Sequence, residues 1–539
     1  MRNVIMSFAN RGPIIPGTLC QLVAEYEETH AVEDYWAFGW QVWPVIRNIL
    51  ANDIWTATQT HDWCGDRASP NSKKVRNGRL TRRLEFYCQP LQNYVRWVWD
   101  VKMGAALAPS RSCDVLIFGS GARYQFLGGK WVHYATGPFA DLLEDARLRC
   151  HTWQWEEQPT PFARASANVV PALKGWQRLA GALGHFRTSS PLPTWYPEIE
   201  SFSREHFARP LSWEALSGEL LAIVQASRVL ERWIRGARPG LVVLDCWSNW
   251  PLIAAALAAH RLGIPVMELQ HGIQEHSHVA YHWWRKEPAG GWPARPDFFW
   301  VWGERAENLY YETNRTRQEV IRGGNPWIRR WLLKKDPEVE TACKEVSRLV
   351  NGYSRSILVT LQNPGSLDLG YLKDIISTSP SDWIWLIRTH PAWKRDRLEF
   401  EQELRGSGRA VVRLHEPEEW PLYALLRVVD LHVSSYSTCS NEALAFGKPT
   451  ILLSEQGLAI FREFVEEGIM FYAERANDFC EIAEQAFAVD PARLKGAGRS
   501  LFVVDENDAS RAVKRVSEVV ESQREKGGSG SISRKGRIA

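Results

Sequence analysis

The sequence lacks a strong excess of charge of either sign. Its 539 residues include 65 Lys and Arg against 62 Asp and Glu, a formal net charge of +3 at pH 7. A protein dedicated to nucleic acid presents a strongly basic face, so we expect no nucleic acid among the partners of this chain. The hydrophobic fraction of 45% is typical of a globular protein. A chain of this length predicts two domains.

The sequence also has no long hydrophobic run. None approaches the ~20 apolar residues that span a bilayer, and the longest candidate, from Pro251 to Val266, is interrupted by His260 and Arg261. The segment from Met1 to Gly17 lacks the apolar core of a secretory signal. We therefore expect a cytoplasmic protein. A basic cluster between Lys73 and Arg83 is typical of a solvated face, with peripheral contact at the inner face of the cytoplasmic membrane as the alternative.

Metal-binding patterns are missing as well. The nine cysteines are scattered, odd in number and never spaced as Cys-x-x-Cys, which argues against a disulfide framework or a zinc site and indicates reduced thiols. No Asp-x-Asp pair of the kind that holds a divalent metal beneath a sugar nucleotide is present. We therefore expect no metal and no cofactor. Any phosphate would be bound by helix N-termini, hydroxyl groups and basic side chains.

Tryptophan, in contrast, is abundant, with 27 residues. Trp36, Trp40 and Trp43 recur at near-helical spacing within a segment, Tyr35 to Leu50, that is predicted to be a helix. This spacing favours one packed face of that helix. Stacking of these rings on a sugar is the alternative.

The C-terminal half alternates apolar runs with helical segments. The predicted strands are Ser356–Leu361, Trp383–Arg388, Ala410–Leu414, Val428–Val433 and Thr450–Leu453, and the predicted helices between them are Leu369–Ser377, Trp393–Leu404, Glu418–Leu426 and Asn441–Phe446. Single helices between nearly continuous apolar strands predict an α/β domain with a parallel doubly wound sheet. Polar clusters follow three of these strands, starting at Gln362, Arg388 and Ser434. We expect them to converge, because ligands bind at the carboxyl ends of the strands in such sheets.

The third cluster is the most informative. Ser434, Ser435, Ser437 and Thr438 lie where a strand passes into a helix, and Glu442 follows one turn later. Free backbone N–H groups and the helix dipole favour an anion at such a turn. Ser437 or Thr438 acting only as a helix cap is the alternative. The concentration of hydroxyl groups favours a pocket for phosphate and sugar.

The preceding region predicts a second sheet. Strands and helices alternate from Leu241 to Gly324, which places Asp245 and His271 at strand ends. The imidazole of His271 titrates near neutral pH, and Gly272 leaves room for a ligand, so His271 is a candidate general base. Asp245 is a helix cap, the base itself or the residue that orients His271. The alternative for His271 is a structural role in a loop.

The division of the chain follows from these patterns. We expect an N-terminal acceptor-side domain over residues 1–335, with a helical, Trp-rich extension at its start, and a C-terminal nucleotide-donor domain over residues 336–525. A disordered basic tail is expected over residues 526–539. In the C-terminal domain, Arg388 and His390 are candidates for contact with phosphate oxygens, because Pro391 fixes the turn in which they lie.

The order of these motifs resembles that of bacterial glycosyltransferases of the GT-B architecture. The motifs are Gln270-His271-Gly272, Gly324-x-Pro326, His390-Pro391, and Ser434-Ser435 with Glu442 and Gly447-Lys448-Pro449. They are most similar to polysialyl- and Kdo-type capsule transferases and to CDP-glycerol glycerophosphotransferases. The resemblance implies two Rossmann-like domains facing each other across a cleft.

It also implies roles for single residues. His390, Ser434 and Ser435 would bind the phosphates of a nucleotide-activated donor, Glu442 would bind its ribose, and His271 would deprotonate the acceptor. The expected function is metal-independent transfer of a sugar or polyol phosphate to a cell-surface glycan or a lipid-linked glycan. The alternatives are a sugar-nucleotide 2-epimerase, which would need more acidic residues at the cleft, and a non-catalytic subunit of a polysaccharide assembly complex.

Overall fold

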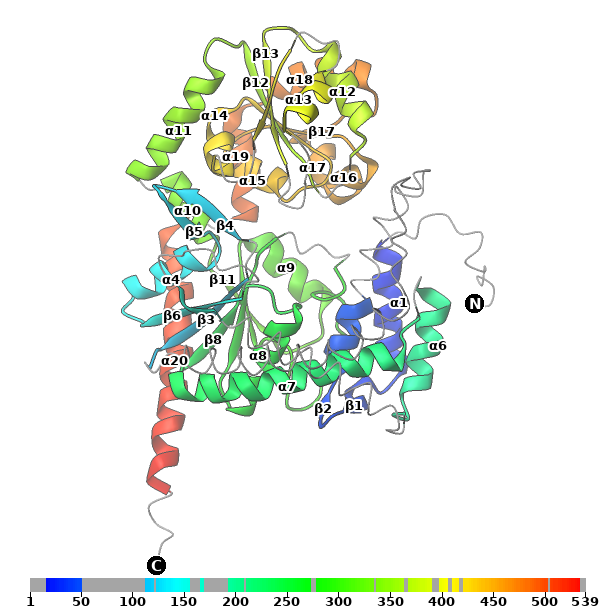
Figure 1. Ribbon diagram of the computed structural model, residues 1–539, viewed down its shortest axis with the longest axis vertical. Helices are drawn as coiled ribbons and strands as arrows, with labels where there is room; N and C mark the ends of the chain where they lie inside the picture. Colours follow the sequence, from blue (N-terminus) through cyan, green and yellow to red (C-terminus); the bar gives the residue numbers. More distant parts are fainter. Residues whose placement is uncertain are drawn as a thin grey trace, which may run out of the picture.

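The computed structural model describes residues 16–50, 112–120, 123–155, 165–168, 192–207, 210–272, 278–333, 336–362, 367–389, 397–405, 410–415, 420–502 and 505–533. The predictions for His390 and for the basic cluster from Lys73 to Arg83 lie outside these residues. Two parallel β-sheets with flanking helices lie one above the other along the long axis of the molecule (Figure 1). The sheet of the N-terminal domain is the lower one in this view.

The sheet of the N-terminal domain has seven parallel strands among the described residues. Their order across the sheet is β11-β10-β9-β8-β3-β6-β7, with β3 at Val115–Ser120, β6 at Cys150–Trp155, β7 at Ala165–Asn168, β8 at Leu241–Leu244, β9 at Val266–Leu269, β10 at Phe298–Val301 and β11 at Glu319–Arg322. The chain moves outward from β3 to β7, then crosses back to β8 and moves outward in the other direction. The strand order therefore reverses between β3 and β8, which is where doubly wound sheets bind ligands.

The sheet of the C-terminal domain is wound in the same way. Its six parallel strands follow the order β14-β13-β12-β15-β16-β17, with β12 at Arg355–Thr360, β13 at Trp383–Arg388, β14 at Val411–His415, β15 at Leu431–Ser434, β16 at Thr450–Leu452 and β17 at Met470–Tyr472. The order reverses between β12 and β15. Both domains are thus Rossmann-like, and the predicted GT-B-like fold is confirmed.

Helices surround the two sheets. Those of the N-terminal domain are α4 (Thr136–Asp145), α6 (Tyr196–His206), α7 (Trp213–Ala237), α8 (Trp250–Arg261) and α9 (Glu304–Thr313). Helix α10 (Pro326–Leu333) connects the two domains. The helices that follow it are α11 (Pro337–Val350), α12 (Leu369–Thr378), α13 (Arg397–Arg405), α14 (Leu422–Val428), α15 (Cys439–Ala445), α16 (Glu455–Ile460), α17 (Arg462–Glu466), α18 (Phe479–Phe487) and α19 (Pro491–Leu501). A hairpin, β4 (Tyr124–Leu127) with β5 (Lys130–His133), is inserted between β3 and α4.

The N-terminal extension differs from the prediction of one helix over Tyr35 to Leu50. After α1 (Pro16–Thr29), a short hairpin of β1 (Trp36–Ala37) and β2 (Trp40–Gln41) precedes a helix over 43–50. Gly39 adopts a φ of 83° in the turn of this hairpin, a conformation that interrupts a helix. Trp40 and Trp43 are buried as expected, but Trp36 is 53% exposed. The spacing of the three rings was therefore not that of one helix face.

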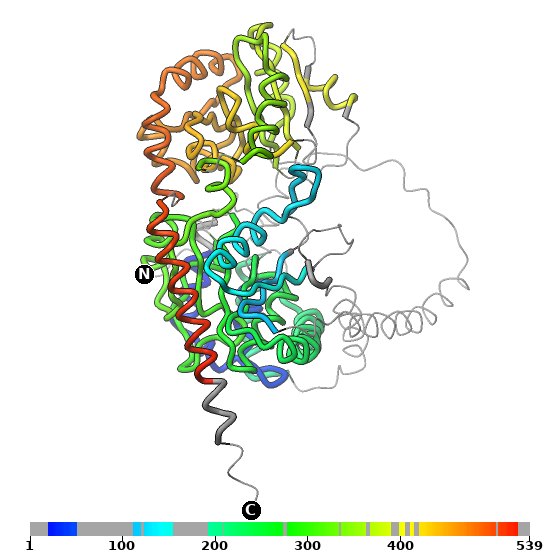
Figure 2. The backbone as a smooth tube through the Cα atoms, turned by 90° about the vertical axis from the view of Figure 1, so that its left-hand side faces the viewer, coloured from blue at the N-terminus to red at the C-terminus, as the bar shows by residue number. Residues whose placement is uncertain are grey.

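The last helix, α20 (Glu506–Ser533), leaves the C-terminal domain and returns to the sheet of the N-terminal domain (Figure 2). Val516 and Val520 pack with Ile117 and Val243 in one buried cluster. A helix from the end of the chain therefore packs a valine face on the sheet of the N-terminal domain. The helix also continues to Ser533, past residue 526 at which we expected disorder.

The two domains touch through polar and aromatic contacts. The rings of Trp302 and Phe502 stack with their centroids 5.4 Å apart. A guanidinium nitrogen of Arg305 lies 2.7 Å from a carboxylate oxygen of Glu463. A Cβ atom at Gly303 would lie 2.4 Å from the carbonyl oxygen of Leu501, so only glycine permits this approach of the two backbones.

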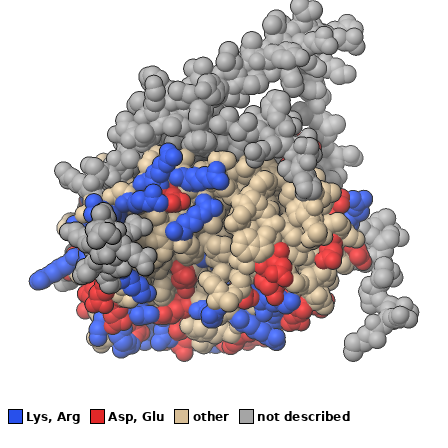
Figure 3. Space-filling view, turned by 90° about the horizontal axis from the view of Figure 1, so that it is seen from below, with Lys and Arg blue, Asp and Glu red and all other residues tan. Residues whose placement is uncertain are grey.

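The surface and the thiols agree with the composition. Basic and acidic side chains both occur on the lower face of the N-terminal domain, as expected from a nearly balanced charge (Figure 3). None of the seven cysteines in the described part of the chain forms a disulfide bond. Among the described helices, none has both the length and the hydropathy that crossing a bilayer requires.

Candidate functional site

A cavity of about 380 Å³ lies between the two domains, at the carboxyl ends of their strands. Its N-terminal wall includes Tyr124, Tyr134, Gln270, His271, Trp300 and Trp302, and its C-terminal wall includes Thr360, Gln362, Arg388, Ser437, Thr438 and Glu442. The C-terminal wall lies directly beyond β12, β13 and β15. The three polar clusters, as far as they are described, therefore converge on one edge of the sheet, as the winding of the strands requires.

The serine turn, which runs from Ser434 to Thr438, has some side chains at the cavity and others in the protein interior. Ser437 and Thr438 line the cavity. The hydroxyl of Ser437 accepts a hydrogen bond of 3.2 Å from the backbone N–H of Cys439, whereas the Thr438 side chain makes no capping hydrogen bond to α15. Ser437 therefore accepts a hydrogen bond from the first turn of α15 and also lines the cavity.

Ser434 and Ser435 lie behind this wall. The pairing of β12 with β15 sets Ser434 beside Thr360, and the Ser434 hydroxyl donates to the Thr360 carbonyl oxygen at 3.1 Å. The hydroxyl of Ser435 donates to that of Ser454 at 2.9 Å. Both serines are buried and neither lines the cavity. Their contacts hold the turn that presents Ser437 and Thr438.

Glu442 lies at the cavity in the first turn of α15. The hydroxyl of Tyr423 donates to a carboxylate oxygen of Glu442 at 2.7 Å. Burial raises the pKa of Glu442 above its usual value, although the hydrogen bond from Tyr423 and the charge of Arg388 oppose the shift. Arg388 is itself held by a hydrogen bond of 2.7 Å to the carbonyl oxygen of Trp420. This wall thus offers a carboxyl group, a guanidinium group and two hydroxyl groups.

His271 faces the cavity from the opposite wall, two residues beyond the end of β9. Its side chain is 17% exposed. A Cβ atom at Gly272 would lie 4.0 Å from the hydroxyl of Thr438, so the His-Gly loop and the serine turn approach each other across the cavity. Burial and the nearby charge of Arg123 lower the pKa of His271 to about 3. The ring is therefore neutral at neutral pH.

Glu268, which the sequence analysis did not single out, lies beneath His271. One of its carboxylate oxygens is 3.3 Å from Nδ1 of His271 and accepts a hydrogen bond of 2.8 Å from the hydroxyl of Tyr281. The carboxyl group is fully buried, and this burial raises its pKa well above the usual value. A glutamate inside the apolar strand Val266–Leu269 was the available signal, because a buried charge is costly without a partner.

Asp245 is buried behind the cavity and does not line it. Its carboxylate lies 3.5 Å from Nε of Arg123 and 3.5 Å from Nε2 of His133. Nδ1 of His133 accepts a hydrogen bond of 3.0 Å from the backbone N–H of Thr136, so Nε2 carries the proton that faces Asp245. Arg123 in turn donates to the carbonyl oxygen of His271 at 2.8 Å. Arg123 therefore joins the carboxylate of Asp245 to the backbone of His271.

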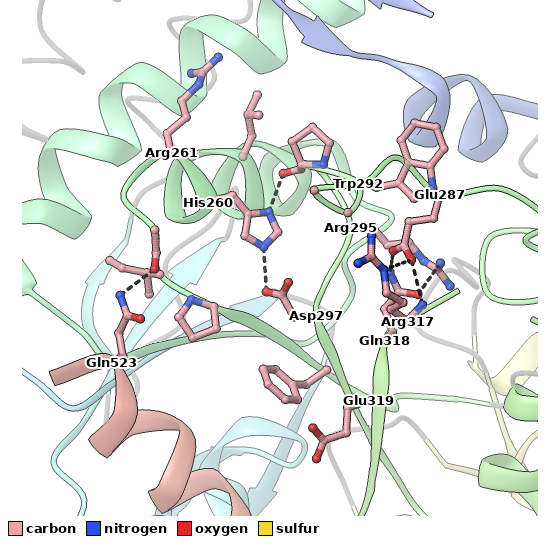
Figure 4. Close-up of a pocket in the computed structure, with 18 of the residues that line it drawn as sticks. His260, Arg261, Glu287, Trp292, Arg295, Asp297, Arg317, Gln318, Glu319 and Gln523 are labelled. Carbon is pink, nitrogen blue, oxygen red and sulfur yellow. Dashed lines mark hydrogen bonds and ion pairs between the residues drawn. The ribbon is translucent and has the colours of Figure 1, made fainter. Parts of the chain in front are cut away.

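A larger cavity of about 970 Å³ lies at the other end of the N-terminal sheet, beside the beginnings of β10 and β11 (Figure 4). Some of the polar groups that line it are paired with each other. Nε2 of His260 lies 2.9 Å from Asp297, and the backbone N–H of Arg317 donates to Glu287 at 2.9 Å. These contacts join the loop before β10 to its neighbours.

The comparisons with known proteins give low similarities. No protein-family model matches the sequence, and no curated protein matches it significantly. The solved structures that it resembles include UDP-GlcNAc 2-epimerase from Neisseria meningitidis bound to UDP-GlcNAc, with 15% identity, a TM-score of 0.44 and coverage of 76% of this chain and 100% of that chain.

Two glycosyltransferases give similar values. The glycosyltransferase SnogD from Streptomyces nogalater has 18% identity, a TM-score of 0.38 and coverage of 76% of this chain and 100% of that chain. A UDP-glucosyltransferase from Polygonum tinctorium has 13% identity, a TM-score of 0.43 and coverage of 77% and 100%. At these identities and scores, we take no functional argument from the similarity.

Proposed function

We propose that this chain is a metal-independent glycosyltransferase that moves a sugar or a polyol phosphate from a nucleotide-activated donor to a cell-surface or lipid-linked glycan. The observation that carries the proposal is the shared cavity. Two Rossmann-like sheets, each with a reversal in strand order, direct their carboxyl ends at the same space. In doubly wound sheets this is the position at which nucleotides bind.

The donor would bind to the wall of the C-terminal domain. The hydroxyls of Ser437 and Thr438 and the guanidinium of Arg388 supply hydrogen-bond donors for phosphate oxygens. His390 is proposed to join them. Glu442, which can accept hydrogen bonds from hydroxyl groups, would contact the ribose. Ser434 and Ser435 would support this wall from behind rather than touch phosphate.

The acceptor would bind to the wall of the N-terminal domain. His271 lies across the cavity from the serine turn, so it can reach a hydroxyl group that attacks the donor from the opposite side. The neutral imidazole would take the hydroxyl proton while the new bond forms to the donor. The bond between the donor and its leaving phosphate would break at the same time, and the groups on the other wall would bind the released phosphate.

A second candidate is a sugar-nucleotide 2-epimerase, and one observation favours it. We expected this activity to need more acidic groups at the cleft; Glu442 lines the cavity, and Glu268 lies behind the opposite wall, beneath His271. Burial raises the pKa of both carboxyl groups, which brings them closer to the range in which they exchange protons near neutral pH. Such an enzyme would consume a nucleotide sugar with no acceptor present.

A single experiment separates these functions. The purified chain is incubated with a panel of nucleotide sugars and CDP-glycerol, with and without fragments of bacterial surface polysaccharide, and the released nucleotide is measured. Release that depends on the polysaccharide supports transfer. Conversion of a nucleotide sugar without polysaccharide supports the epimerase. Binding without any conversion would contradict both and leave a non-catalytic subunit of an assembly complex.

A further inference from the structure

Glu268 is the most unusual residue of the strand that carries it. Strand β9 reads Val266-Met267-Glu268-Leu269, and all four residues are buried. Isolated carboxylates are rarely retained in such a position, because removing a charge from water is costly unless hydrogen bonds or an opposite charge replace the water. The neighbours of this carboxyl group therefore indicate its role.

One of those neighbours, His271, lines the cavity. Oε1 of Glu268 lies 3.3 Å from Nδ1 of His271 and receives the hydroxyl hydrogen of Tyr281 at 2.8 Å. Nδ1 of His271 is a buried atom that makes no well-aligned hydrogen bond, so the contact with Glu268 is an ion-pair distance only, whereas the ring as a whole lines the cavity. Nε2 is the other ring nitrogen and does not take part in the contact with Glu268. Contacts of this kind tighten into well-aligned hydrogen bonds when a substrate closes the site.

We propose that Glu268 is the positioning residue for His271: its carboxylate accepts the proton of Nδ1 and leaves Nε2 free to take a proton from the acceptor hydroxyl. The inference rests on the proposed function, because it concerns how the proposed base is prepared. Glu268 does not touch the acceptor in this arrangement. It acts through the ring of His271.

The protons of the pair can be counted. When Glu268 is protonated, it donates to Nδ1, and the ring carries its own proton on Nε2, where it can donate but not accept. Loss of one proton from the pair gives a carboxylate that accepts from Nδ1–H, and Nε2 then has a free lone pair. When Nε2 takes the acceptor proton, the resulting imidazolium lies beside a carboxylate, which stabilises it.

The surrounding charges set the pH at which the pair loses this proton. Burial raises the pKa of Glu268, and Asp245 raises it further, whereas the Tyr281 hydroxyl, the backbone of Trp247 and the charge of Arg123 lower it. Cys246 and His278 are the other titratable groups that face the pair. The base form of His271 is therefore expected to appear only above the ordinary pKa of a glutamate.

The test reads the tautomer of His271 without any substrate. The full chain is labelled with ¹⁵N-histidine, and the ring signals of His271 are assigned by their loss in His271→Gln. We expect Nε2 to change from protonated to unprotonated as the pH rises. Glu268→Gln should abolish this transition, since its amide does not ionise. Tyr281→Phe should move the transition to higher pH, because it removes a hydrogen bond that favours the carboxylate.

Glu442→Gln is the matched control, because it removes another buried carboxyl group of the same cavity and should leave the transition in place. The proposal is overturned if the transition persists unchanged in Glu268→Gln, or if Glu442→Gln abolishes it instead. A Glu268→Gln protein that does not fold leaves Tyr281→Phe as the deciding variant, and an unshifted transition there also overturns the proposal.

A kinetic measurement separates this inference from the proposed function. With whichever nucleotide sugar the panel selects, Glu268→Gln should lower kcat by ~10²-fold or more with little change in the donor KM. If no nucleotide sugar binds the unaltered chain, the proposed function fails while the tautomer experiment still decides the role of Glu268. If the unaltered chain is active and Glu268→Gln retains its kcat, the inference fails and the function stands.

Discussion

At the scale of single residues, the serine turn contains side chains that face the cavity and side chains that stabilise the domain. Ser437 and Thr438 face the cavity, whereas Ser434 is buried against the backbone of Thr360. Substitutions at these neighbouring positions should therefore have different effects. Ser437→Ala combined with Thr438→Ala removes two hydroxyl groups from the donor wall, and Ser434→Ala removes a hydrogen bond inside the domain.

We predict that the double variant weakens nucleotide binding tenfold or more, because hydrogen bonds to a charged group are worth ~1.5–3 kcal/mol each. Ser434→Ala should lower the free energy of unfolding by about 1 kcal/mol and leave the affinity nearly unchanged. Calorimetric titration and urea unfolding of each variant measure both quantities. A loss of affinity confined to Ser434→Ala would instead support direct contact of Ser434 with phosphate.

His271 carries the next prediction at this scale. His271→Ala should reduce turnover by ~10²–10⁴-fold, because the reaction loses its general base, while the affinity for the donor nucleotide stays nearly intact. Steady-state kinetics and nucleotide titration of the variant test this. Near-normal turnover in His271→Ala, together with a folded but inactive Asp245→Ala, would identify Asp245 as the base.

At the scale of elements, helix α20 ties the two halves of the chain together. Arg524 of this helix and Arg149 both pair with Asp114, which precedes β3. Arg515 forms a two-pronged contact with Glu319 on β11, with distances of 2.7 and 2.8 Å. These pairs flank the valine face that covers the sheet, so they fix the position of the helix.

The acid sensitivity of the fold should report on this contact. Burial by itself would raise the pKa of Asp114, but hydrogen bonds from Arg149 and Arg524 outweigh it and lower the pKa to about 2. A lowered folded-state pKa gives stability that is present above the unfolded value and is lost as the pH falls towards 2. We predict that Asp114→Asn costs about 2 kcal/mol at pH 6 and much less at pH 2.5.

Urea unfolding of both proteins at the two pH values measures this difference, and the comparison of variant with parent removes the contribution of the other carboxyl groups. A cost of Asp114→Asn that does not change with pH would contradict the assignment.

The elements also differ in how well the sequence predicted them. Strands that form one continuous apolar run were placed closely: β13 was predicted from Trp383 to Arg388, as observed, and the predicted strand Ser356–Leu361 is β12, one residue away from its observed bounds. β6 was missed because its sequence, Cys150 to Trp155, mixes apolar and polar residues, and β7 is short and polar. The spacing of Trp36, Trp40 and Trp43 predicted a helix, but Gly39 forms a hairpin turn between them.

Part of the candidate site was predictable because it lies at the ends of strands that the sequence predicts well. His271, Asp245 and the serine turn follow recognisable strands, so their convergence could be inferred from parallel winding alone. Arg123 and His133 could not be placed, because they belong to an inserted hairpin with no repeating pattern. Their contacts with Asp245 join residues more than a hundred positions apart, and no local signal in the sequence reports such a pairing.

At the scale of the whole molecule, the account predicts chemistry without a metal ion. Among the described residues, no group of three or more His, Cys, Asp or Glu side chains is arranged to hold one. The hydroxyl groups of the serine turn and Arg388 would balance the leaving phosphate in its place. Turnover should therefore survive EDTA. Loss of turnover with EDTA that Mg²⁺ or Mn²⁺ restores would contradict this mechanism.

The central claim is that the cavity between the two domains binds a nucleotide-activated donor. Thermal unfolding with CMP, CDP, UDP, GDP and dTDP tests it most directly, because a ligand at a hundred times its dissociation constant stabilises the folded state by about 2.7 kcal/mol. We predict that at least one nucleotide raises the unfolding temperature, and that the shift is smaller when Ser437 and Thr438 are both replaced by alanine. The claim is contradicted if no nucleotide shifts the transition, or if the shift is the same in the altered protein.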